Sequence, residues 1–340
     1  MVRLRAREGD LIKTKSNVVF DVKGLTHPDG KIIAFPRSIP LPQGTRQGKD
    51  AAYDKVYNLG DRFKYLQENH PDLIVFDSVL GETMCEVPAD QVAEHYKPEE
   101  KLWALRSVKD LTILESKALH LAETLKTEAG IPWSSVGISG SIMARLTTEK
   151  SDIDPIIYGI ENCRKAYSAL QRLLKLDCGF KPYTRAELQE LFDFRSKDTQ
   201  MSFEDFVLVE SRKAFQGKFM GTDYFIRFVK DWREITEQYG DVQYKNSGYA
   251  KITAIIADSA DSLFTPCTYK LENVNVVEGP KLAPIAEIVS FRGRFCEQAE
   301  NGEAIEAQGK VELVTDNKSG NEHYRLILGN KPSDYMILQV

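Results

Sequence analysis

The stretch Ser135-Val-Gly-Ile-Ser-Gly-Ser141, which Ser151-Asp-Ile-Asp154 follows further along the chain, decides the central part of the fold. It predicts a short apolar strand, a Gly-Ser turn, a short helix and a second strand that opens with two aspartates. Gly140 allows the backbone to turn tightly and to approach a ligand closely. A helix that begins at Ser141 directs unpaired N–H groups and a positive dipole end toward whatever lies before it. The turn is therefore a candidate phosphate-binding site.

The two aspartates form a candidate metal site. Asp152 and Asp154 are two residues apart, and on a strand such residues point to the same face. Two carboxylates on one face can share a hard cation such as Mg²⁺ or Mn²⁺. The simpler alternative is that Asp152 is a solvated turn residue, as Ser-Asp often is, and that Asp154 is a charge at a sheet edge. That alternative leaves the neighbouring Gly-Ser turn unexplained.

Length and composition are those of a globular protein with more than one domain. The chain has 340 residues, and its formal net charge of -5 does not indicate a nucleic-acid partner. The first fifty residues carry ten Lys or Arg against five Asp or Glu, a candidate basic patch. The five cysteines show no paired spacing, which argues against structural zinc and disulfides. Because no apolar run approaches about 18 residues and no signal peptide is evident, we expect a cytoplasmic protein without a membrane partner.

The sequence pattern changes twice along the chain and predicts three domains. Residues 1–98 are predicted to form a mixed, mostly β domain, residues 99–240 an α/β domain, and residues 241–340 a small β-barrel. The barrel is either of the OB type, which binds oligonucleotides, or one that only packs against a neighbour. The clearest single elements are helices over Leu59–Asn69, Leu111–Leu125, Glu161–Leu174, Ala186–Asp193 and Ser202–Phe215, and a strand over Thr222–Val229.

The Gly140-Ser141 turn, ten intervening residues and Asp152-Ile-Asp154 together resemble the motif of the DNA polymerase beta-type nucleotidyltransferase superfamily. The resemblance implies an α+β multidomain protein whose central polymerase-beta-like nucleotidyltransferase α/β domain is flanked by the N-terminal domain and the C-terminal barrel. It also implies that Gly140 and Ser141 hold the triphosphate of a nucleotide, that Asp152 and Asp154 bind magnesium, and that a later strand supplies a third carboxylate. The flanking domains resemble those of uncharacterised archaeal proteins with this domain, for which no reaction is known.

Asp223 is the candidate for the third carboxylate. In polymerase-like members this acid often stands two residues before an arginine, but Phe225 stands two residues before Arg227. Asp223 is the nearest acid on the same face, displaced by one pleat of roughly 6.5–7 Å. Such a displacement matters, because the ions of a two-metal site lie about 3.5–4 Å apart. The alternative is that Asp223 only ends the turn that begins at Gly221.

Three further residues bear on the predicted site. Pro155 follows Asp154 and cannot donate to a ladder, so it must lie at an edge, in a bulge or at the first position of a strand. Arg145 is a candidate nucleotide-binding residue, and the alternative is an exposed helical arginine. Arg227 is a second candidate, for which a charged strand end is the alternative.

The function that we expect from the resemblance is a magnesium-dependent nucleotidyltransferase. It moves a nucleoside monophosphate from a nucleoside triphosphate to a hydroxyl acceptor and releases pyrophosphate. The acceptor is an RNA or DNA end, a small molecule or a protein side chain. The alternatives are a catalytically silent nucleic-acid-binding protein and a nucleotide sensor. For the former, Phe291-Arg-Gly-Arg-Phe295 alternates basic and aromatic residues as single-strand binders do, although a barrel strand gives the same alternation.

Overall fold

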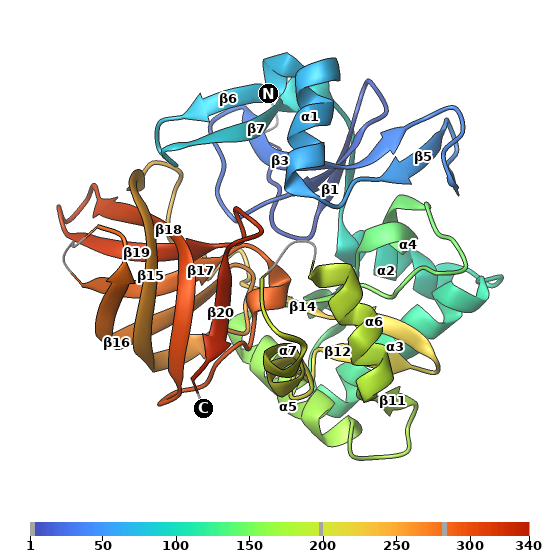
Figure 1. The fold of residues 1–340 in the computed structure, drawn as a ribbon. Coiled ribbons are helices and arrows are strands. Elements are labelled where there is room, and N and C mark those ends of the chain that lie inside the picture. The colour runs from blue at the N-terminus through green and yellow to red at the C-terminus, as the bar shows by residue number, and fades with distance from the viewer. Residues whose placement is uncertain (1–3, 197–199, 281–283, 340) are drawn as a thin grey trace. The chain divides into compact units, whose positions relative to one another are not determined.

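The computed structural model describes residues 4–196, 200–280 and 284–339, which form two compact units. The first consists of Met1–Ile74, Cys85–Pro182 and Ala214–Thr236, and the second of Val75–Met84, Tyr183–Lys213 and Glu237–Val340. The described residues contain seven α-helices and several sheets, so the predicted mixed α/β class is confirmed (Figure 1). The first unit combines parts of the first two predicted domains, and the three-domain layout stays a prediction.

The N-terminal residues form an antiparallel sheet, most of which belongs to the first unit. Its strand order is β4-β5-β3-β2-β1-β8, and β7 pairs with β3 and with β6. The strands are β1 (Leu11–Thr14), β2 (Val19–Val22), β3 (Lys31–Pro40), β4 (Arg46–Gln47), β5 (Ala52–Lys55), β6 (Ile74–Asp77), β7 (Glu82–Pro88) and β8 (Val92–Tyr96). Helix α1 (Leu59–Asn69) has the predicted bounds, because the Asn58 side chain caps its first turn and Pro71 follows its end.

A buried three-stranded sheet carries the Gly-Ser and Asp-x-Asp stretch. Its order is β14-β10-β9, with β10 parallel to β14 and antiparallel to β9. The strands are β9 (Val136–Ile138), β10 (Pro155–Tyr158) and β14 (Arg227–Val229). Helices α2 (Pro98–Ser107) and α3 (Ile113–Ala129) contact β9, and α5 (Ile160–Leu173) contacts β10. The predicted helices Leu111–Leu125 and Glu161–Leu174 thus correspond to α3 and α5, which cover this sheet.

The predicted strand Thr222–Val229 is divided between two sheets. Its first half is β13 (Thr222–Phe225), which pairs with β12 (Gln216–Phe219), and β12 pairs with β11 (Phe180–Lys181). Its second half is β14 in the central sheet. Between the two halves, Ile226 donates its N–H to the carbonyl of Phe215 at 2.8 Å. This hydrogen bond lies outside both ladders and marks where the chain leaves one sheet for the other.

The described residues of the second unit form two α-helices and a six-stranded sheet. Helices α6 (Arg185–Arg195) and α7 (Phe203–Glu210) correspond to the predictions over Ala186–Asp193 and Ser202–Phe215, although α7 ends earlier. The strands are β15 (Val242–Asp261), β16 (Cys267–Glu278), β17 (Ile285–Ser290), β18 (Ala304–Asp316), β19 (Glu322–Leu328) and β20 (Tyr335–Leu338). Pairing runs β15-β16-β17-β19-β18 and returns from β18 to β15, so the sheet is partly closed. None of the described helices of the protein is long and apolar enough to cross a membrane.

Candidate functional site

The Gly-Ser turn joins β9 to a five-residue helix, α4 (Gly140–Ala144). Gly140 adopts a left-handed φ of +62°, a conformation that costs little only for glycine. A Cβ atom at this position would lie 1.8 Å from Oδ2 of Asp154. The glycine is therefore required by the protein itself, because it allows the turn to close against the Asp154 carboxylate.

Both serines of the turn have a defined environment. The Ser139 N–H donates to the carbonyl of Asp154 at 2.8 Å, and the Ser139 hydroxyl donates to the carbonyl of Gly9 at 2.7 Å. Ser141 is only 2 % exposed, and its hydroxyl has no hydrogen-bond partner among the described residues. A buried hydroxyl without a partner costs free energy. The turn is thus fixed to the start of β10 and contains one buried hydroxyl without a partner among the described residues.

The aspartate pair lies where β10 begins. Ile153 is buried, bridges to Tyr224, and donates its N–H to the carbonyl of Asp223 at 2.9 Å. Since side chains alternate along extended backbone, Asp152 and Asp154 share the face opposite to Ile153. Pro155 is the first residue of β10, which is one of the three positions that its missing N–H permits. The strand therefore tolerates the proline directly after the pair.

Burial, and after it the negative charge of Asp152, raise the pKa of the Asp154 carboxyl to about 7. Lys55, Arg227 and Arg37 oppose this increase in the pKa of Asp154. At neutral pH and without a bound cation, the Asp154 carboxyl is therefore only partly ionised. A divalent cation between two such carboxylates favours their charged forms. The donor set of two neighbouring carboxylates thus fits a hard cation.

Two cations of the N-terminal sheet act on the aspartates, and we did not predict either. Lys55 ends β5 and Arg37 lies in β3. Burial lowers the pKa of Lys55, as does the positive charge of Arg37, whereas the charges of Asp152 and Asp154 raise it. The only signal in the sequence was the basic excess of the first fifty residues, which includes Arg37 but not Lys55.

Arg227 lies on β14 opposite Ile156 of β10, and its positive charge lowers the pKa of Asp154. Its Nη1 atom also makes an ion pair of 3.0 Å with Oε1 of Glu8, a fully buried side chain. Lys23 contacts the same Glu8 oxygen at 3.1 Å. Part of the guanidinium thus holds the N-terminal segment, and its role in nucleotide binding stays a prediction.

Arg145 and Asp223 lie in more exposed positions. Arg145 ends α4 in a left-handed conformation, and its side chain is exposed. Asp223 is exposed and makes an ion pair with Lys218 at 3.1 Å across the β12–β13 hairpin. Among the described residues, no three or more His, Cys, Asp or Glu side chains are placed to hold a metal ion. The roles of Arg145 in nucleotide binding and of Asp223 as third metal ligand therefore stay predictions.

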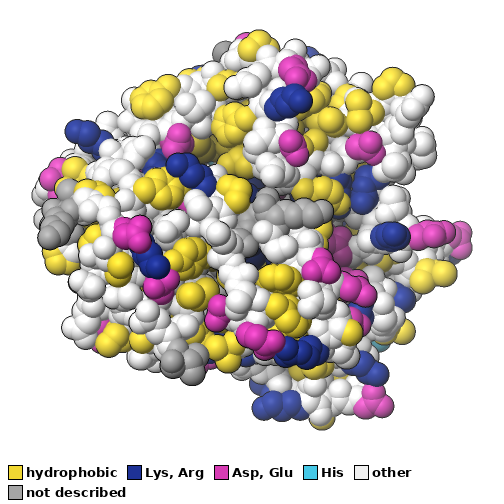
Figure 2. Space-filling view, viewed as in Figure 1, with side chains coloured by type: hydrophobic (Ala, Val, Ile, Leu, Met, Phe, Trp, Pro, Cys, Tyr) yellow, Lys and Arg dark blue, Asp and Glu magenta, His cyan; other side chains and the backbone are white. Residues whose placement is uncertain are grey.

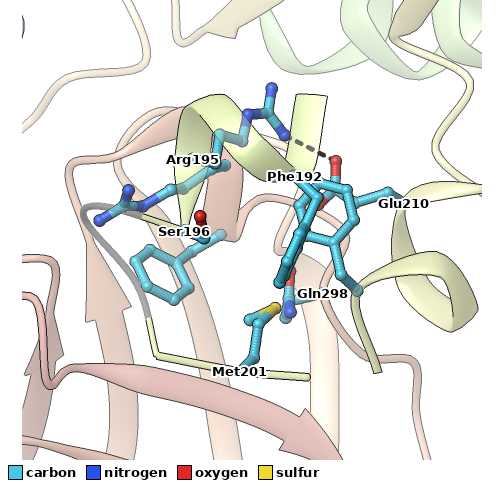
Figure 3. A pocket seen from close by; sticks show the side chains of 9 residues that line it. Phe192, Arg195, Ser196, Met201, Glu210 and Gln298 are labelled. Atoms are coloured by element: carbon cyan, nitrogen blue, oxygen red, sulfur yellow. Dashed lines mark hydrogen bonds and ion pairs between the residues drawn. The ribbon is translucent and has the colours of Figure 1, made fainter. Parts of the chain in front are cut away.

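A pocket in the second unit contains none of the predicted site residues. It lies among α6, α7 and the segment after β17, and Phe192, Met201, Phe206 and Phe295 supply its apolar lining (Figure 3). Figure 3 shows Arg195 directed at Glu210, with which it makes an ion pair of 2.7 Å. The same Glu210 also contacts the buried Lys213 at 2.5 Å. These charges pair with one another, so we assign the cluster to the stability of the unit.

The basic and aromatic segment Phe291-Arg-Gly-Arg-Phe295 does not continue a barrel strand. β17 ends at Ser290, and Gly293–Phe295 forms a short 3-10 helix. Phe295 is 1 % exposed and cannot stack on a base. On the face drawn in Figure 2, Lys and Arg side chains are interspersed with Asp and Glu. Neither feature supports the nucleic-acid-binding alternative.

The sequence is similar to that of a known protein over nearly the whole chain. No family model matches the sequence, and no solved structure matches it. Uncharacterized protein MJ1086 of Methanocaldococcus jannaschii is 32% identical to this chain over 335 residues, which are 96% of this chain and 96% of that protein. Identity of this extent covers segments of both compact units. The chain therefore belongs to the same family as MJ1086.

Proposed function

We propose that this protein is a metal-dependent nucleotidyltransferase that moves a nucleoside monophosphate from a nucleoside triphosphate to a hydroxyl acceptor, with release of pyrophosphate. One observation carries the proposal: the Gly140 turn closes directly against Asp154, with the unpartnered Ser141 hydroxyl beside it. The resemblance to polymerase beta-type transferases requires this proximity of phosphate turn and carboxylates. The alternative of a solvated turn and an edge charge does not require it.

Each residue of the site has a defined task in the proposed reaction. Asp152 and Asp154 would hold Mg²⁺, which lowers the pKa of an acceptor hydroxyl and neutralises phosphate charge. The Ser141 hydroxyl donates to a phosphate oxygen, and Gly140 leaves room for the turn beside Asp154. Arg227 adds positive charge next to the pair while Glu8 fixes its position. These residues bind and orient the nucleotide, so much of the rate enhancement would come from positioning and charge neutralisation.

The second unit supports a finer assignment of its sheet. Five strands pair in a circuit, β15-β16-β17-β19-β18-β15, in which β17 and β19 are parallel and the other pairs antiparallel. We infer a small barrel of the OB type from this circuit.

Label transfer tests the proposed function. The protein is incubated with each α-labelled nucleoside triphosphate, Mg²⁺ or Mn²⁺, and RNA, DNA and small-molecule acceptors. We expect incorporation by the wild type, and its loss by at least about a hundredfold in Asp152→Asn/Asp154→Asn, because the metal ligands are removed. Asp110→Asn, at an exposed acid of the same unit, is the matched control. Equal incorporation by the wild type and the double variant, or none by the wild type with any acceptor, contradicts the proposal.

The ion pair of Asp223 with Lys218 favours a second candidate, a nucleotide sensor that performs no transfer. A two-metal reaction needs ligands for both ions, and an exposed, paired Asp223 does not supply one in this conformation. For a sensor we expect that a triphosphate with Mg²⁺ raises the melting temperature in the absence of any incorporation of label. The two candidates are distinguished by the same labelling experiment.

A further inference from the structure

The hairpin formed by β4 and β5 packs directly on the helix after the Gly-Ser turn. Tyr53 of β5 is 3 % exposed and belongs to one apolar cluster with Met143 and Leu146. Nη1 of Arg46 in β4 donates to the carbonyl of Leu146 at 2.6 Å. The N-terminal sheet therefore forms one wall of the site that carries the aspartate pair.

Lys55 follows Tyr53 by two residues on β5, so the two side chains share a face of the strand. This is the face that packs on the α4 segment. Lys55 is half-buried, yet its Nζ atom has no hydrogen bond or ion pair with any described residue. Lysine is rarely buried without a partner, because its charge loses hydration. The position is therefore costly for the free protein.

Neither Asp152 nor Asp154 offsets the cost of burying the Lys55 charge by a direct ion pair. No salt bridge within 4.0 Å joins Lys55 to Asp152 or Asp154 among the described residues, although their charges act on one another. Arg37, on the neighbouring strand, is also half-buried and stacks over Tyr57 at 5.0 Å. Lys55 and Arg37 thus lie near enough to the aspartate pair for their charges to act on it, and the buried Ser141 hydroxyl follows Gly140, which closes against Asp154. This is a set of donors for a multiply charged anion.

We propose that Lys55, with Arg37 beside it, binds the terminal phosphates of a nucleoside triphosphate. The inference rests on the proposed function for the identity of the ligand as the nucleotide substrate. It assigns a substrate-binding task to the N-terminal sheet, to which neither the resemblance nor the comparisons assign one. A triphosphate fits better than a monophosphate, because the cations come from a different element than the Gly-Ser turn and a chain of phosphates can reach both.

Isothermal titration of the full-length protein tests the assignment. The ligands are inorganic tripolyphosphate, ATP, AMP and a single-stranded RNA oligonucleotide. We expect that Lys55→Met weakens the binding of tripolyphosphate and ATP by about tenfold to a hundredfold, as loss of a charge-assisted contact does, and leaves AMP unaffected. Lys55→Arg should restore most of the affinity. Lys49→Met, an exposed lysine of the same hairpin, is the matched control.

The fold of the variant is checked independently. Because Lys55→Met removes a half-buried charge without a partner, we expect an unchanged or higher melting temperature. The assignment is overturned if Lys55→Met binds tripolyphosphate and ATP as well as the wild type does, if AMP is weakened equally, or if only the oligonucleotide responds. It is also overturned if the folded wild type binds no tripolyphosphate. Triphosphate binding that depends on Lys55 without any label transfer supports the assignment and contradicts the transferase proposal alone.

Discussion

At the residue scale, Gly140 is the position where the turn and the metal site constrain each other. Gly140→Ala adds left-handed strain and places a methyl group 1.8 Å from Oδ2 of Asp154. Gly130 is the control, because its φ of +64° is nearly the same and no atom lies within 4 Å of an added Cβ. We expect chemical denaturation to show a loss of about 1 kcal/mol for Gly130→Ala and about 2–4 kcal/mol for Gly140→Ala. Equal losses would mean that the contact with Asp154 is absent in solution.

The carboxyl of Asp154 gives a pH dependence at the same scale. Its pKa is about 7 in the folded protein and about 3.9 in the unfolded chain, so folding favours the protonated form. The favourable contribution of this carboxyl to the free energy of unfolding is complete at pH values below its pKa in the unfolded chain. It is lost as the pH rises through the pKa of the carboxyl in the folded protein. Asp154→Asn keeps a neutral side chain at every pH. We therefore expect it to stabilise the metal-free protein by up to about 4 kcal/mol at pH 8 and by clearly less at pH 5.

Thermal melts of the metal-free protein at the two pH values measure this effect, with Asp110→Asn as the control. Mg²⁺ added at pH 8 should reverse the order, because it stabilises the wild type and has little effect on Asp154→Asn. A variant that is less stable than the wild type at pH 8 without metal would show that the Asp154 carboxyl is not destabilised by burial.

At the scale of elements, the sequence predicts well those helix ends and turns that nearby residues determine. The capping box of Thr184 and Glu187 predicts the start of α6, and both of its hydrogen bonds are present. Pro71 predicts the end of α1 in the same way, and the structure adds the cap that the Asn58 side chain forms at its start. The Gly-Ser turn and β9 are likewise where the pattern of apolar residues and glycine places them, whereas β10 begins at Pro155, after the two aspartates that were predicted to open it. Each of these signals lies within a few residues of the feature that it determines.

Features that depend on tertiary contacts were not predictable from the same patterns. The break between β13 and β14 at Ile226 depends on a hydrogen bond with Phe215. The ion pair of Asp223 depends on the register that places Lys218 opposite to it. Lys55 is almost a hundred residues from the aspartates in sequence, and only the packing of β5 on the α4 segment brings it to the site. The spacing of residues along the sequence does not show which distant residues come together in the fold.

At the scale of the whole molecule, the two compact units are interleaved in sequence, since each consists of three separate segments. The relative of 32% identity matches over both units, so the family retains segments of each. All of the predicted site residues, together with Lys55 and Arg37, belong to the first unit. The pocket of Figure 3 and the partly closed sheet belong to the second. A nucleotide should therefore affect the two units differently.

Hydrogen exchange measured by mass spectrometry can detect this difference. We expect ATP with Mg²⁺ to slow exchange in β5 and α4, because a ligand that binds only the folded site reduces local opening there. Peptides from β16 and β17 should exchange at the same rate with and without nucleotide. Tripolyphosphate alone should protect β5, where Lys55 lies, more than β10. Protection confined to β16 and β17 would instead place the ligand on the partly closed sheet of the second unit. That result would favour the nucleic-acid-binding alternative, because the aspartate pair would then have no part in recognition.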